Sequence, residues 1–464
     1  MNTILLNPTD VLFFRDGRPM EGSLAGHGAA WPLPNVIDAA FHAALHRSGL
    51  ATLSHAHDQR RGADRHGTDN RRFGSLVTAG PFPVRFADDE GKPLAVPKWF
   101  FPRPLDLLDG TLRPALAPTT AFAAAHSSLP APLKYAVANR LAPSKGNPAK
   151  AWLSGDRYHE YLHQESPGIL DHQIPRSDVH DDDDFSDAEA TIGIGLDAET
   201  GTTGQGDAEG QIYSARYLRL RDAWRLGVFA RTSEKSQTSD SRVDLIESLL
   251  NGPQQLLVGG QQRLCTAKRV QGNALPLPMG RTKCFAQHQG KCLVKWILLS
   301  PAIWPEIPEV SKDGRTMTPH CGGWLPNWVH QETGKVMLRA GNRMERRYSG
   351  KHGRGYADDA VVIGAKLVAA IVPKPIPVTG WALANDVDRA EGGAKSVHFA
   401  VPAGAVYYFE ADSEEHAAHL AAALNWHGGD SNPQTIHNRR STLMGEKGFG
   451  LGVCGTWTPA EIKG

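Results

Sequence analysis

Apolar residues near the start of the chain follow first the spacing of a strand and then that of a helix. Residues 3–14 (TILLNPTDVLFF) predict a strand that Pro8 interrupts. A glycine-rich loop follows, after which Asn35 stands where a helix cap is expected and Gly49 where the helix should stop. Apolar side chains recur between them at helical spacing: Val36, Ile37, Ala40, Phe41, Ala44 and Leu45.

The middle of the chain carries shorter apolar runs that favour strands. Residues 79–108 alternate such runs with proline and glycine, which predicts short strands or ordered loop. Residues 211–220 and 224–231 predict a hairpin with its turn at Asp222. The intervening stretch 178–210, which includes four consecutive aspartates, is interpreted as a solvated and partly disordered loop.

Cap residues predict two further helices in the second half. Ser241 is placed to cap a short helix, with Asp244 at the position of a capping box. Asp412 and Glu415 mark the start of a helix over 413–424. The remaining apolar runs predict strands, or a glycine loop followed by a strand, over 255–258, 293–299 and 445–457.

Short strand–helix units in two halves predict an α+β fold. We expect two ferredoxin-like domains, which are split βαβ or RRM-like units, with long glycine-rich and insertion loops. The N-terminal domain is predicted over residues 1–222, with an acidic insertion at about 178–210. The C-terminal domain is predicted over residues 223–464 and ends in a glycine-rich loop.

The net charge of +1 hides an uneven distribution of charge along the 464 residues. Residues 171–210 contain 12 acidic side chains and one basic side chain, Arg176. The other 424 residues contain 49 basic and 37 acidic side chains, a net charge of +12. A basic body with one acidic segment is compatible with a polyanionic partner.

Cysteine content and hydropathy favour a cytoplasmic protein without membrane contact. The five cysteines are unevenly spaced and predict no disulfide framework. The first ten residues lack the basic region of a signal peptide, and the best apolar run, 361–373, is shorter than the ~20 residues of a membrane span. Cys284, His288 and Cys292 lack paired C-x2-C spacing, so neither a metal nor a cofactor is expected.

Two glycine-rich loops with basic residues are candidates for binding an RNA backbone. In the first, Arg15 and Arg18 flank a tight turn and are followed by Gly22, Gly26 and His27. Arginine can bind phosphate through two nitrogens, and glycine permits close approach of the backbone. The turn alone would equally fit an ordinary Asp-Gly turn.

The second loop lies near the C-terminus and combines glycines with a base and an aromatic ring. It is neither a Walker loop nor a dinucleotide fingerprint, because it precedes a strand and lacks GxxxxGK[ST]. A glycine-bulged terminal strand would have the same composition. The RNA-binding candidates here are Arg439, Arg440, Lys447, Gly448, Phe449 and Gly450.

Other basic residues extend the candidate RNA surface. Arg263 and Lys268 follow a double-glycine turn. Residues 339–356 contain six Lys or Arg residues, among them Arg346 and Arg347, interleaved with two tyrosines. Bases and aromatic residues in alternation favour contact with single-stranded RNA, although a solvated charged loop can look the same.

Several segments spread along the chain occur together in one order. The most specific are PTDVLFFRDGRPMEG (8–22), VPAGAVYYFE (401–410) and GEKGFGLGVCG (445–455). In combination they resemble the RAMP superfamily of CRISPR effector proteins and, within it, the family of third Cmr subunits of type III-B complexes. Two features depart from that family. Asp38-Ala39-Ala40-Phe41 lacks an arginine often found there, and the acidic block 178–187 has no counterpart.

The resemblance implies a non-catalytic, RNA-binding scaffold in antiviral defence with two ferredoxin-like domains. Such subunits hold the 5′ tag of the guide RNA (crRNA). They also dock the large polymerase-like subunit and RAMP backbone subunits, and they meet target RNA only indirectly. By the same resemblance, the RNA-facing candidates are Arg15, Arg18 and the loops 22–28 and 448–452.

Two other functions remain open at this point. Other RAMP proteins cleave guide RNA without metal, and His27 would be the best candidate for the acid–base residue of such an endoribonuclease. A small-molecule enzyme with a nucleotide site in a glycine loop would instead bind mononucleotides tightly.

Overall fold

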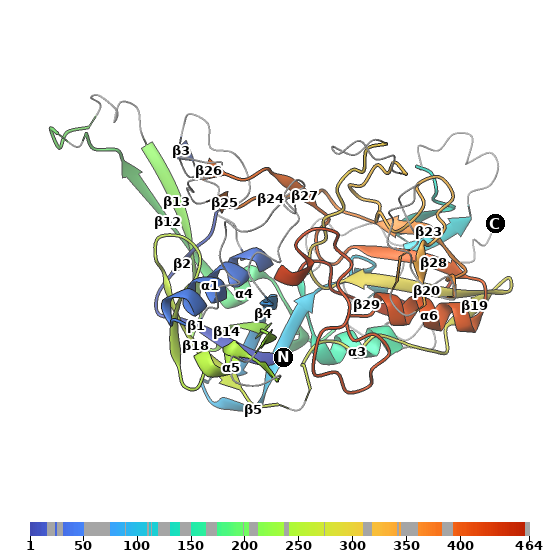
Figure 1. The fold of residues 1–464 in the computed structure, drawn as a ribbon, viewed down its shortest axis with the longest axis horizontal. Coiled ribbons are helices and arrows are strands. Elements are labelled where there is room, and N and C mark those ends of the chain that lie inside the picture. Colours follow the sequence, from blue (N-terminus) through green and yellow to red (C-terminus); the bar gives the residue numbers. More distant parts are fainter. Residues whose placement is uncertain are drawn as a thin grey trace.

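The protein contains two main β-sheets, which lie next to each other in space, and helices pack against each of them (Figure 1). The fold is mixed α and β, with mostly antiparallel sheets and few helices among the described residues. The computed structural model describes residues 1–15, 24–25, 31–50, 75–88, 90–108, 111–112, 114–118, 130–139, 150–163, 174–197, 199–203, 212–235, 241–272, 274–309, 318–340, 343–344, 361–382 and 393–459.

The first sheet has eight strands in the order β11-β10-β5-β4-β14-β1-β18-β17. Its central strands bury apolar side chains such as Ile4, Val228 and Ala267 against helix α1 (Pro34–Arg47) and the short α5 (Leu245–Leu249). The strands are β1 (Asn2–Pro8), β4 (Val77–Ala87), β5 (Pro93–Pro102), β10 (Trp152–Ser154), β11 (Val179–His180), β14 (Trp224–Arg231), β17 (Gln254–Leu257) and β18 (Leu264–Val270).

The second sheet has five strands, in which β29 and β28 flank β20 and β23 pairs with β28. Helix α6 (Glu414–Leu424) covers one face with Ala417, Leu420 and Leu424. The strands are β19 (Ala286–His288), β20 (Lys291–Leu298), β23 (Ala365–Ile371), β28 (Val406–Ala411) and β29 (Gly452–Thr456).

The two sheets share one arrangement of four strands. The row β18-β1-β14-β4 contains the fourth, first, third and second of these strands in chain order, and so does the row β29-β20-β28-β23. Every neighbouring pair in both rows is antiparallel. Each row has three connections between consecutive strands. In the first row, α1 lies in the first connection and α5 in the third, and in the other row α6 lies in the third.

A two-stranded ribbon projects from the first half, at the upper left of Figure 1. It pairs β12 (Ser186–Ile194) with β13 (Ile212–Leu220), and β13 also contacts β2 (Leu12–Phe13) and β3 (Leu24–Ala25). Ile192 and Ile194 on β12 are exposed. The ribbon therefore carries apolar side chains outside both cores.

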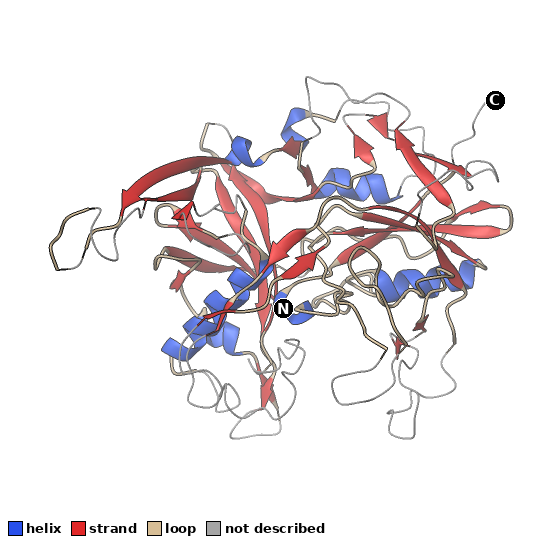
Figure 2. Cartoon of the chain, turned by 90° about the horizontal axis from the view of Figure 1, so that it is seen from above, coloured by secondary structure: helices blue, strands red, loops and turns tan. Residues whose placement is uncertain are grey.

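Figure 2 shows the remaining helices and short strand pairs around the two sheets. The helices are α3 (Gly155–His163), α4 (Asp182–Phe185), η3 (Arg176–Asp178) and η5 (Gly445–Lys447). The local pairs are β6 (Leu107–Leu108) with β7 (Thr111–Leu112), β8 (Pro114–Pro118) with β9 (Tyr135–Asn139), β15 (Glu234–Lys235) with β16 (Arg242–Val243), β21 (Leu338–Arg339) with β22 (Arg343–Met344), β24 (Ile376–Val378) with β27 (His398–Ala400) and β25 (Trp381–Ala382) with β26 (Gly393–Ala394).

One apolar cluster joins the two halves. It packs Phe82 and Phe229 of the first sheet in the same core as Tyr408 and Val453 of the second. The buried carboxylate of Asp106 lies in this region and accepts hydrogen bonds from the hydroxyls of Tyr161 and Tyr408. The halves are therefore held by apolar packing around a polar centre.

Lys295 supplies the positive charge for that centre. Its Nζ lies 2.9 Å from Asp106 Oδ2 and 3.9 Å from the centroid of the Tyr161 ring. Only 9% of the Lys295 side chain and 4% of the Asp106 side chain are exposed. Burial lowers the pKa of the Lys295 amine, and the Asp106 carboxylate partly offsets this effect.

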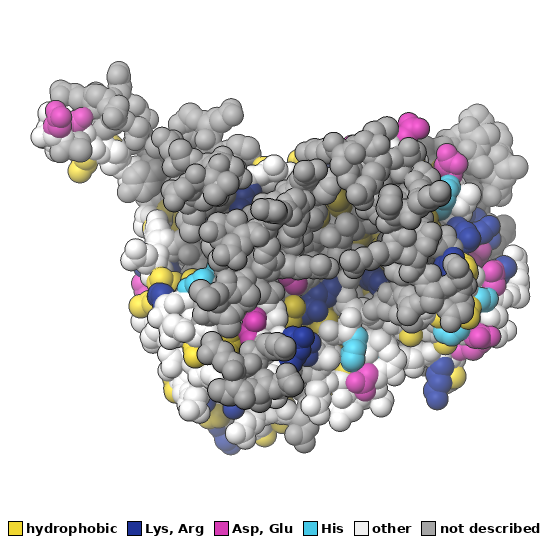
Figure 3. Space-filling model, in the orientation of Figure 1, with side chains coloured by type: hydrophobic (Ala, Val, Ile, Leu, Met, Phe, Trp, Pro, Cys, Tyr) yellow, Lys and Arg dark blue, Asp and Glu magenta, His cyan; other side chains and the backbone are white. Residues whose placement is uncertain are grey.

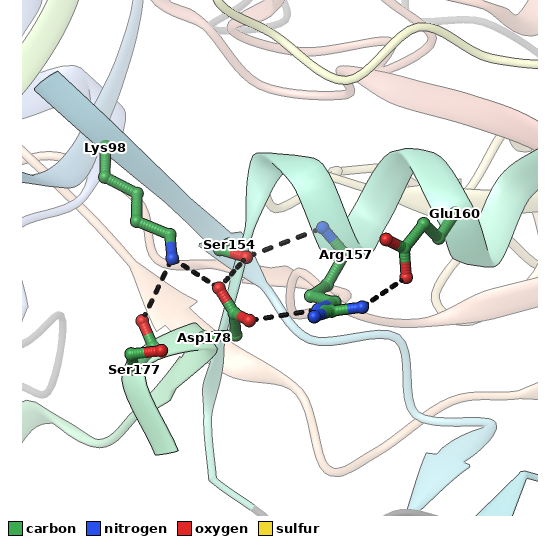
Figure 4. A network of polar contacts seen from close by, with 6 residues as sticks. All are labelled: Lys98, Ser154, Arg157, Glu160, Ser177 and Asp178. Atoms are coloured by element: carbon green, nitrogen blue, oxygen red, sulfur yellow. Dashed lines mark hydrogen bonds and ion pairs between the residues drawn. The ribbon is translucent and has the colours of Figure 1, made fainter. Parts of the chain in front are cut away.

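A second polar network fixes α3 against the first sheet (Figure 4). The Asp178 carboxylate accepts hydrogen bonds from Ser154 Oγ at 2.9 Å and from Arg157 Nε at 2.9 Å, and it pairs with Lys98 of β5. Arg157 also donates to Glu160 at 2.6 Å. Although burial works in the opposite direction, these donors hold the pKa of Asp178 below its usual value.

The prediction of a disordered acidic loop was wrong for most of residues 178–197. The aspartate run forms α4, because the Asp181 and Asp184 side chains make a reciprocal capping box at its start. Lys150 pairs with both carboxylates, at 3.0 and 3.2 Å. Charge neutralisation and capping thus order a run whose composition suggested a solvated loop.

Four predicted local features, three helix caps and one hairpin, also differ from the structure. Leu33 rather than Asn35 precedes the first turn of α1, where Pro34 takes the first helical position. Caps shift likewise in the other helices, where Asp244 accepts from Ile246 N and Ser413 accepts from His416 N. The segments 211–220 and 224–231 are strands but not a hairpin, because β13 pairs with β12 while β14 pairs with β1 and β4.

The predicted domain boundary between residues 222 and 223 falls inside the first sheet. Strands β14, β17 and β18 all follow that boundary and pair within the first sheet. The second sheet begins at β19. Within the described ranges, no helix is long and apolar enough to cross a membrane.

Replacing Lys295 by methionine should destabilise the fold strongly, because it leaves the Asp106 charge buried without its counterion. We expect a loss of about 3–5 kcal/mol in unfolding free energy, measured by urea denaturation. Lys291→Met is the matched control on the same strand, since Lys291 is 44% exposed and pairs with Asp412 at the surface. Its expected cost is below about 1 kcal/mol. Equal costs for the two variants would contradict the role assigned to Lys295.

Candidate nucleic-acid interface

The C-terminal glycine loop, residues 445–450, lies where the two halves meet. Gly448 has a φ of +95°, and a Cβ at this position would lie 2.9 Å from Ala79 Cα and 3.4 Å from Pro34 Cβ. Only glycine therefore allows the loop to contact both β4 and the start of α1. In Figure 3, basic side chains appear near the centre of the displayed face.

Lys447 is engaged in an internal ion pair at this contact. Its Nζ lies 3.6 Å from Asp38 Oδ2, and the two side chains are 12% and 3% exposed. Burial raises the pKa of Asp38, and the Lys447 charge partly offsets the shift. Lys447 thus stabilises the contact between the halves, and its proposed contact with RNA stays a prediction.

Phe449 and Gly450 also serve the internal packing of the loop. Phe449 is fully buried in a cluster with Ile303 and Leu443, so its ring is not available for stacking on a base. A Cβ on Gly450 would lie 2.0 Å from the backbone nitrogen of Ser441. The glycine pattern that suggested close approach of RNA instead permits close approach of the protein's own backbone.

Arg439 and Arg440 are adjacent in sequence but differ in their contacts. Arg440 Nε donates to the carbonyl oxygen of Ala423 at 2.6 Å, which ties the loop to the end of α6. Nε and Nη2 of Arg439 are both buried and have no hydrogen-bond partner. Burial lowers the pKa of each guanidinium to about 10, so both remain charged at neutral pH.

A second group of candidate residues surrounds the double-glycine turn of the first half. Gly260 N donates to Phe13 O at 2.9 Å, and a Cβ on Gly259 would lie 2.4 Å from the same oxygen. The turn therefore packs directly beneath the end of β2, two residues before Arg15, which is exposed. This packing brings two basic candidates, Arg15 and Arg263, to one edge of the first half.

Arg263 stacks on an aromatic ring at this edge. Its guanidinium carbon lies 5.0 Å from the centroid of the Tyr217 ring, and the Tyr217 hydroxyl donates to Gln261 Oε1 at 2.8 Å. The ring of Phe13 lies 5.5 Å from that of Tyr217. We call Phe13, Arg15, Tyr217, Gln261 and Arg263 the arginine–aromatic patch. A cation beside aromatic rings is a common way of holding single-stranded RNA.

The other candidate residues are separated from this patch or undescribed. Lys268 is exposed on β18, where it pairs opposite Leu5. The candidates Arg18, Gly22, Gly26, His27, Arg346 and Arg347 lie outside the described residues.

A cavity of about 470 Å³ opens between the two halves. The first half lines it with Trp31, Gly80 and Trp152, and the second half with Ser300 and Pro377. The Trp31 and Trp152 rings meet edge to face, with centroids 5.3 Å apart. Apolar walls with a few polar atoms suit a planar aromatic ligand.

Asp182 is the acidic residue in the wall of this cavity. Its Oδ1 accepts a hydrogen bond from Trp152 Nε1 at 2.7 Å. Burial raises the pKa of Asp182, although the indole hydrogen bond opposes the shift. The carboxylate offers acceptors to a ligand that carries amino groups.

Sequence reasoning missed the residues of this cavity and the partner of Arg263. Trp31 lies just before the predicted first helix, and the sequence assigned it no role. Asp182 was read as part of a solvated run, and Tyr217 as one residue of a strand. Alternation within β13 could have marked Tyr217 as surface-directed, but nothing in the sequence places it beside Arg263.

The described residues supply groups that suit binding. In the ranges covered by the structure, no group of three or more His, Cys, Asp or Glu side chains is arranged to hold a metal. The arginine–aromatic patch can engage phosphates and bases, and the cavity can hold an aromatic ring.

The family model described as "CRISPR-associated protein (Cas_Cmr3)" matches residues 4–457. A cryo-EM structure of the type III-B Cmr-beta bound to cognate target RNA and AMPPnP is similar at 13% identity over 88% of this chain and 86% of that chain, with a TM-score of 0.38. A structure of Cmr-beta with cognate target RNA gives 14% identity, the same coverages and a TM-score of 0.37. No curated protein matches the chain.

Gly448→Ala should weaken the joint, because a side chain at φ +95° is strained and would collide with Ala79. We expect a loss of about 2–4 kcal/mol in unfolding free energy. Gly429→Ala serves as the control, since a Cβ there meets no atom within 4 Å. Both variants can be compared by thermal and urea unfolding. An unaffected Gly448→Ala protein would show that the loop does not pack on β4.

Asp182→Asn should stabilise the protein at neutral pH, because burial makes the ionised carboxylate unfavourable. The folded-state pKa is raised above 3.8, so the protonated form is favoured in the folded protein and stability declines as pH rises through that pKa. The melting temperature of the variant should exceed that of the wild type at pH 7, and the gap should close as the pH falls to 3.8. Asp183→Asn, an exposed neighbour, controls for net charge. A gap that widens at acidic pH would refute this sign.

Proposed function

The chain belongs to the CRISPR-associated Cas_Cmr3 family, and from that premise we propose that it is a non-catalytic, RNA-binding subunit of a type III-B (Cmr) effector complex. It holds the 5′ tag of the guide RNA. The family predicted from the ordered sequence segments is confirmed by the family match. The role as a scaffold rests on the surface chemistry described above.

The arginine–aromatic patch is the observation that carries this proposal. Arg263 lies over the Tyr217 ring, so one edge presents both a phosphate-binding guanidinium and a stacking ring. Arg15 is exposed, two residues beyond Phe13 of the same edge. Such a surface binds a single strand and needs no acid–base pair. Asp10 Oδ2 lies 3.7 Å from Arg263 Nη1 and helps to hold the guanidinium at the edge.

The proposed architecture is a pair of ferredoxin-like domains with long insertions. The shared strand order of the two sheets supports it, since the order fourth-first-third-second, all antiparallel, is that of a split βαβ unit. Segment 93–180, which contains β5, β10 and β11, then extends the first sheet at the edge strand β4. The first connection of the second unit uses no helix in its described parts.

The proposal includes protein partners and a cytoplasmic site of action. The subunit would dock the large polymerase-like subunit and a RAMP backbone subunit, and it would meet target RNA only through the guide. The ribbon of β12 and β13 supports a role in assembly, because exposed Ile192 and Ile194 would be covered by a neighbour.

The function can be tested by assembling the complex on an end-labelled guide RNA with its 5′ tag. Tyr217→Ala should weaken retention of the tag by roughly tenfold or more, since loss of one stacking platform costs about 1–3 kcal/mol. Tyr217→Phe keeps the ring and should bind like the wild type. Arg242→Ala is a control, because Arg242 is exposed and away from the patch.

The same reactions distinguish a scaffold from a nuclease. Intact RNA bound in preference to a scrambled tag supports the scaffold. Cleavage that resists a chelator and disappears in His27→Ala would overturn it in favour of a metal-independent endoribonuclease. Unchanged retention by Tyr217→Ala would remove the patch from the RNA interface.

A further inference from the structure

Arg439 presents a buried guanidinium edge without a partner. Nε and Nη2 form the edge with which arginine binds phosphate or carboxylate through two parallel hydrogen bonds. Both atoms are buried and unpaired, while the side chain as a whole remains partly exposed. Among the described residues, no other arginine has both of these atoms buried and unpaired.

Other buried arginines of the described chain show what an internal guanidinium usually requires. Arg281 donates from Nε to Leu162 O at 3.3 Å and from Nη1 to Cys284 O at 2.6 Å. Arg440, next to Arg439, donates from Nε to Ala423 O. Burying a charged donor without a partner costs free energy, so an unpaired edge such as that of Arg439 indicates a ligand.

The charges around Arg439 favour an anion. Arg231 of β14 adds to the positive potential, whereas the Glu446 carboxylate reduces it. Lys447 and Asp38 neutralise each other. Arg231 and Arg439 together therefore carry more positive charge than Glu446 neutralises.

Arg439 lies beside the loop that joins the two halves. A Cβ on Gly445 would lie 3.5 Å from Arg439 Cβ, so the start of the C-terminal glycine loop lies against the arginine. The same loop contacts β4 at Gly448. An anion at Arg439 would thus touch the joint rather than one half alone.

We propose that Arg439 is a phosphate-binding residue whose Nε–Nη2 edge accepts one phosphate of the guide strand where the two halves meet. This inference rests on the proposed function for the identity of the strand. The phosphate group could come from an internal phosphodiester or from a 5′-terminal phosphate, and both present the same pair of oxygen acceptors.

The salt dependence of RNA binding tests the proposal. Affinity for the tagged guide is measured in the assembled complex over a series of salt concentrations. Arg439→Gln should lower affinity by about tenfold or more and reduce the slope of log K against log salt by about 0.7. Arg439→Lys keeps the positive charge but loses the paired Nε and Nη2 donors, so the complex with this variant should retain the salt slope and still bind the guide less tightly. Arg242→Gln is the exposed control.

Guides with 5′-hydroxyl and 5′-phosphate ends distinguish the two sources of phosphate. If the terminal phosphate occupies the site, the effect of Arg439→Gln should vanish with the 5′-hydroxyl guide. If a phosphodiester occupies it, the effect should persist with both guides.

The outcomes separate this inference from the proposed function. Wild-type retention of the guide with an unchanged slope in Arg439→Gln would overturn the phosphate role and leave the scaffold intact. If the wild type retains no guide, the proposed function fails. Inorganic phosphate then decides whether Arg439 binds phosphate: it should raise the melting temperature of the wild type, relative to chloride at equal ionic strength, but not that of Arg439→Gln. Equal shifts would overturn the inference. Should Arg439→Gln not fold, Arg439→Lys with wild-type affinity would refute it.

Discussion

The Asp106 carboxylate constrains the whole arrangement, because its donors come from elements that meet only when both sheets are in place. Tyr161 belongs to a helix packed on the first sheet, whereas Lys295 and Tyr408 belong to the second. Each charge alone would be expensive to bury, and only the complete set satisfies them. Partial separation of the halves would leave unpaired charges in an apolar cluster. The two halves are therefore held in one well-defined arrangement, which also fixes the positions of the cavity walls that they share.

The residues near this joint divide between those that build it and those that face outward. Glycine, lysine and phenylalanine in the C-terminal glycine loop are used for contact between protein segments, with Lys447 paired to Asp38 and Phe449 in the core. Arg263 has a different environment, stacked on Tyr217 at an accessible edge. Composition alone does not separate these roles, since both regions combine glycine, base and aromatic residues.

The sequence predicted a fold that mixes α and β elements, several of the strands and the family, but it did not predict the long-range strand partners. The positions of β1, α1 and β29 could be predicted, because they depend on the spacing of apolar residues and on glycines at element ends, both of which are visible in a short stretch of sequence. The predicted boundary between residues 222 and 223 does not follow the strand pairing, because β14 and β18 pair with β1 across more than 200 residues and no local pattern records such pairing. The acidic run was misread for a similar reason. Its order depends on Lys150, which lies some 30 residues away.

The way in which Gly448 reaches back to Ala79 has a consequence for biosynthesis. Strand β4 and the start of α1 emerge from the ribosome long before residues 445–450. Until that segment has been translated, the first half carries an apolar face and the Asp38 carboxylate without their cover. Domains generally fold as units during synthesis, but this one cannot be completed by its own residues. Folding of the first half is thus coupled to synthesis of the second. A ribosome stalled before residue 445 would carry an incompletely folded chain whose exposed apolar surface is a binding site for chaperones.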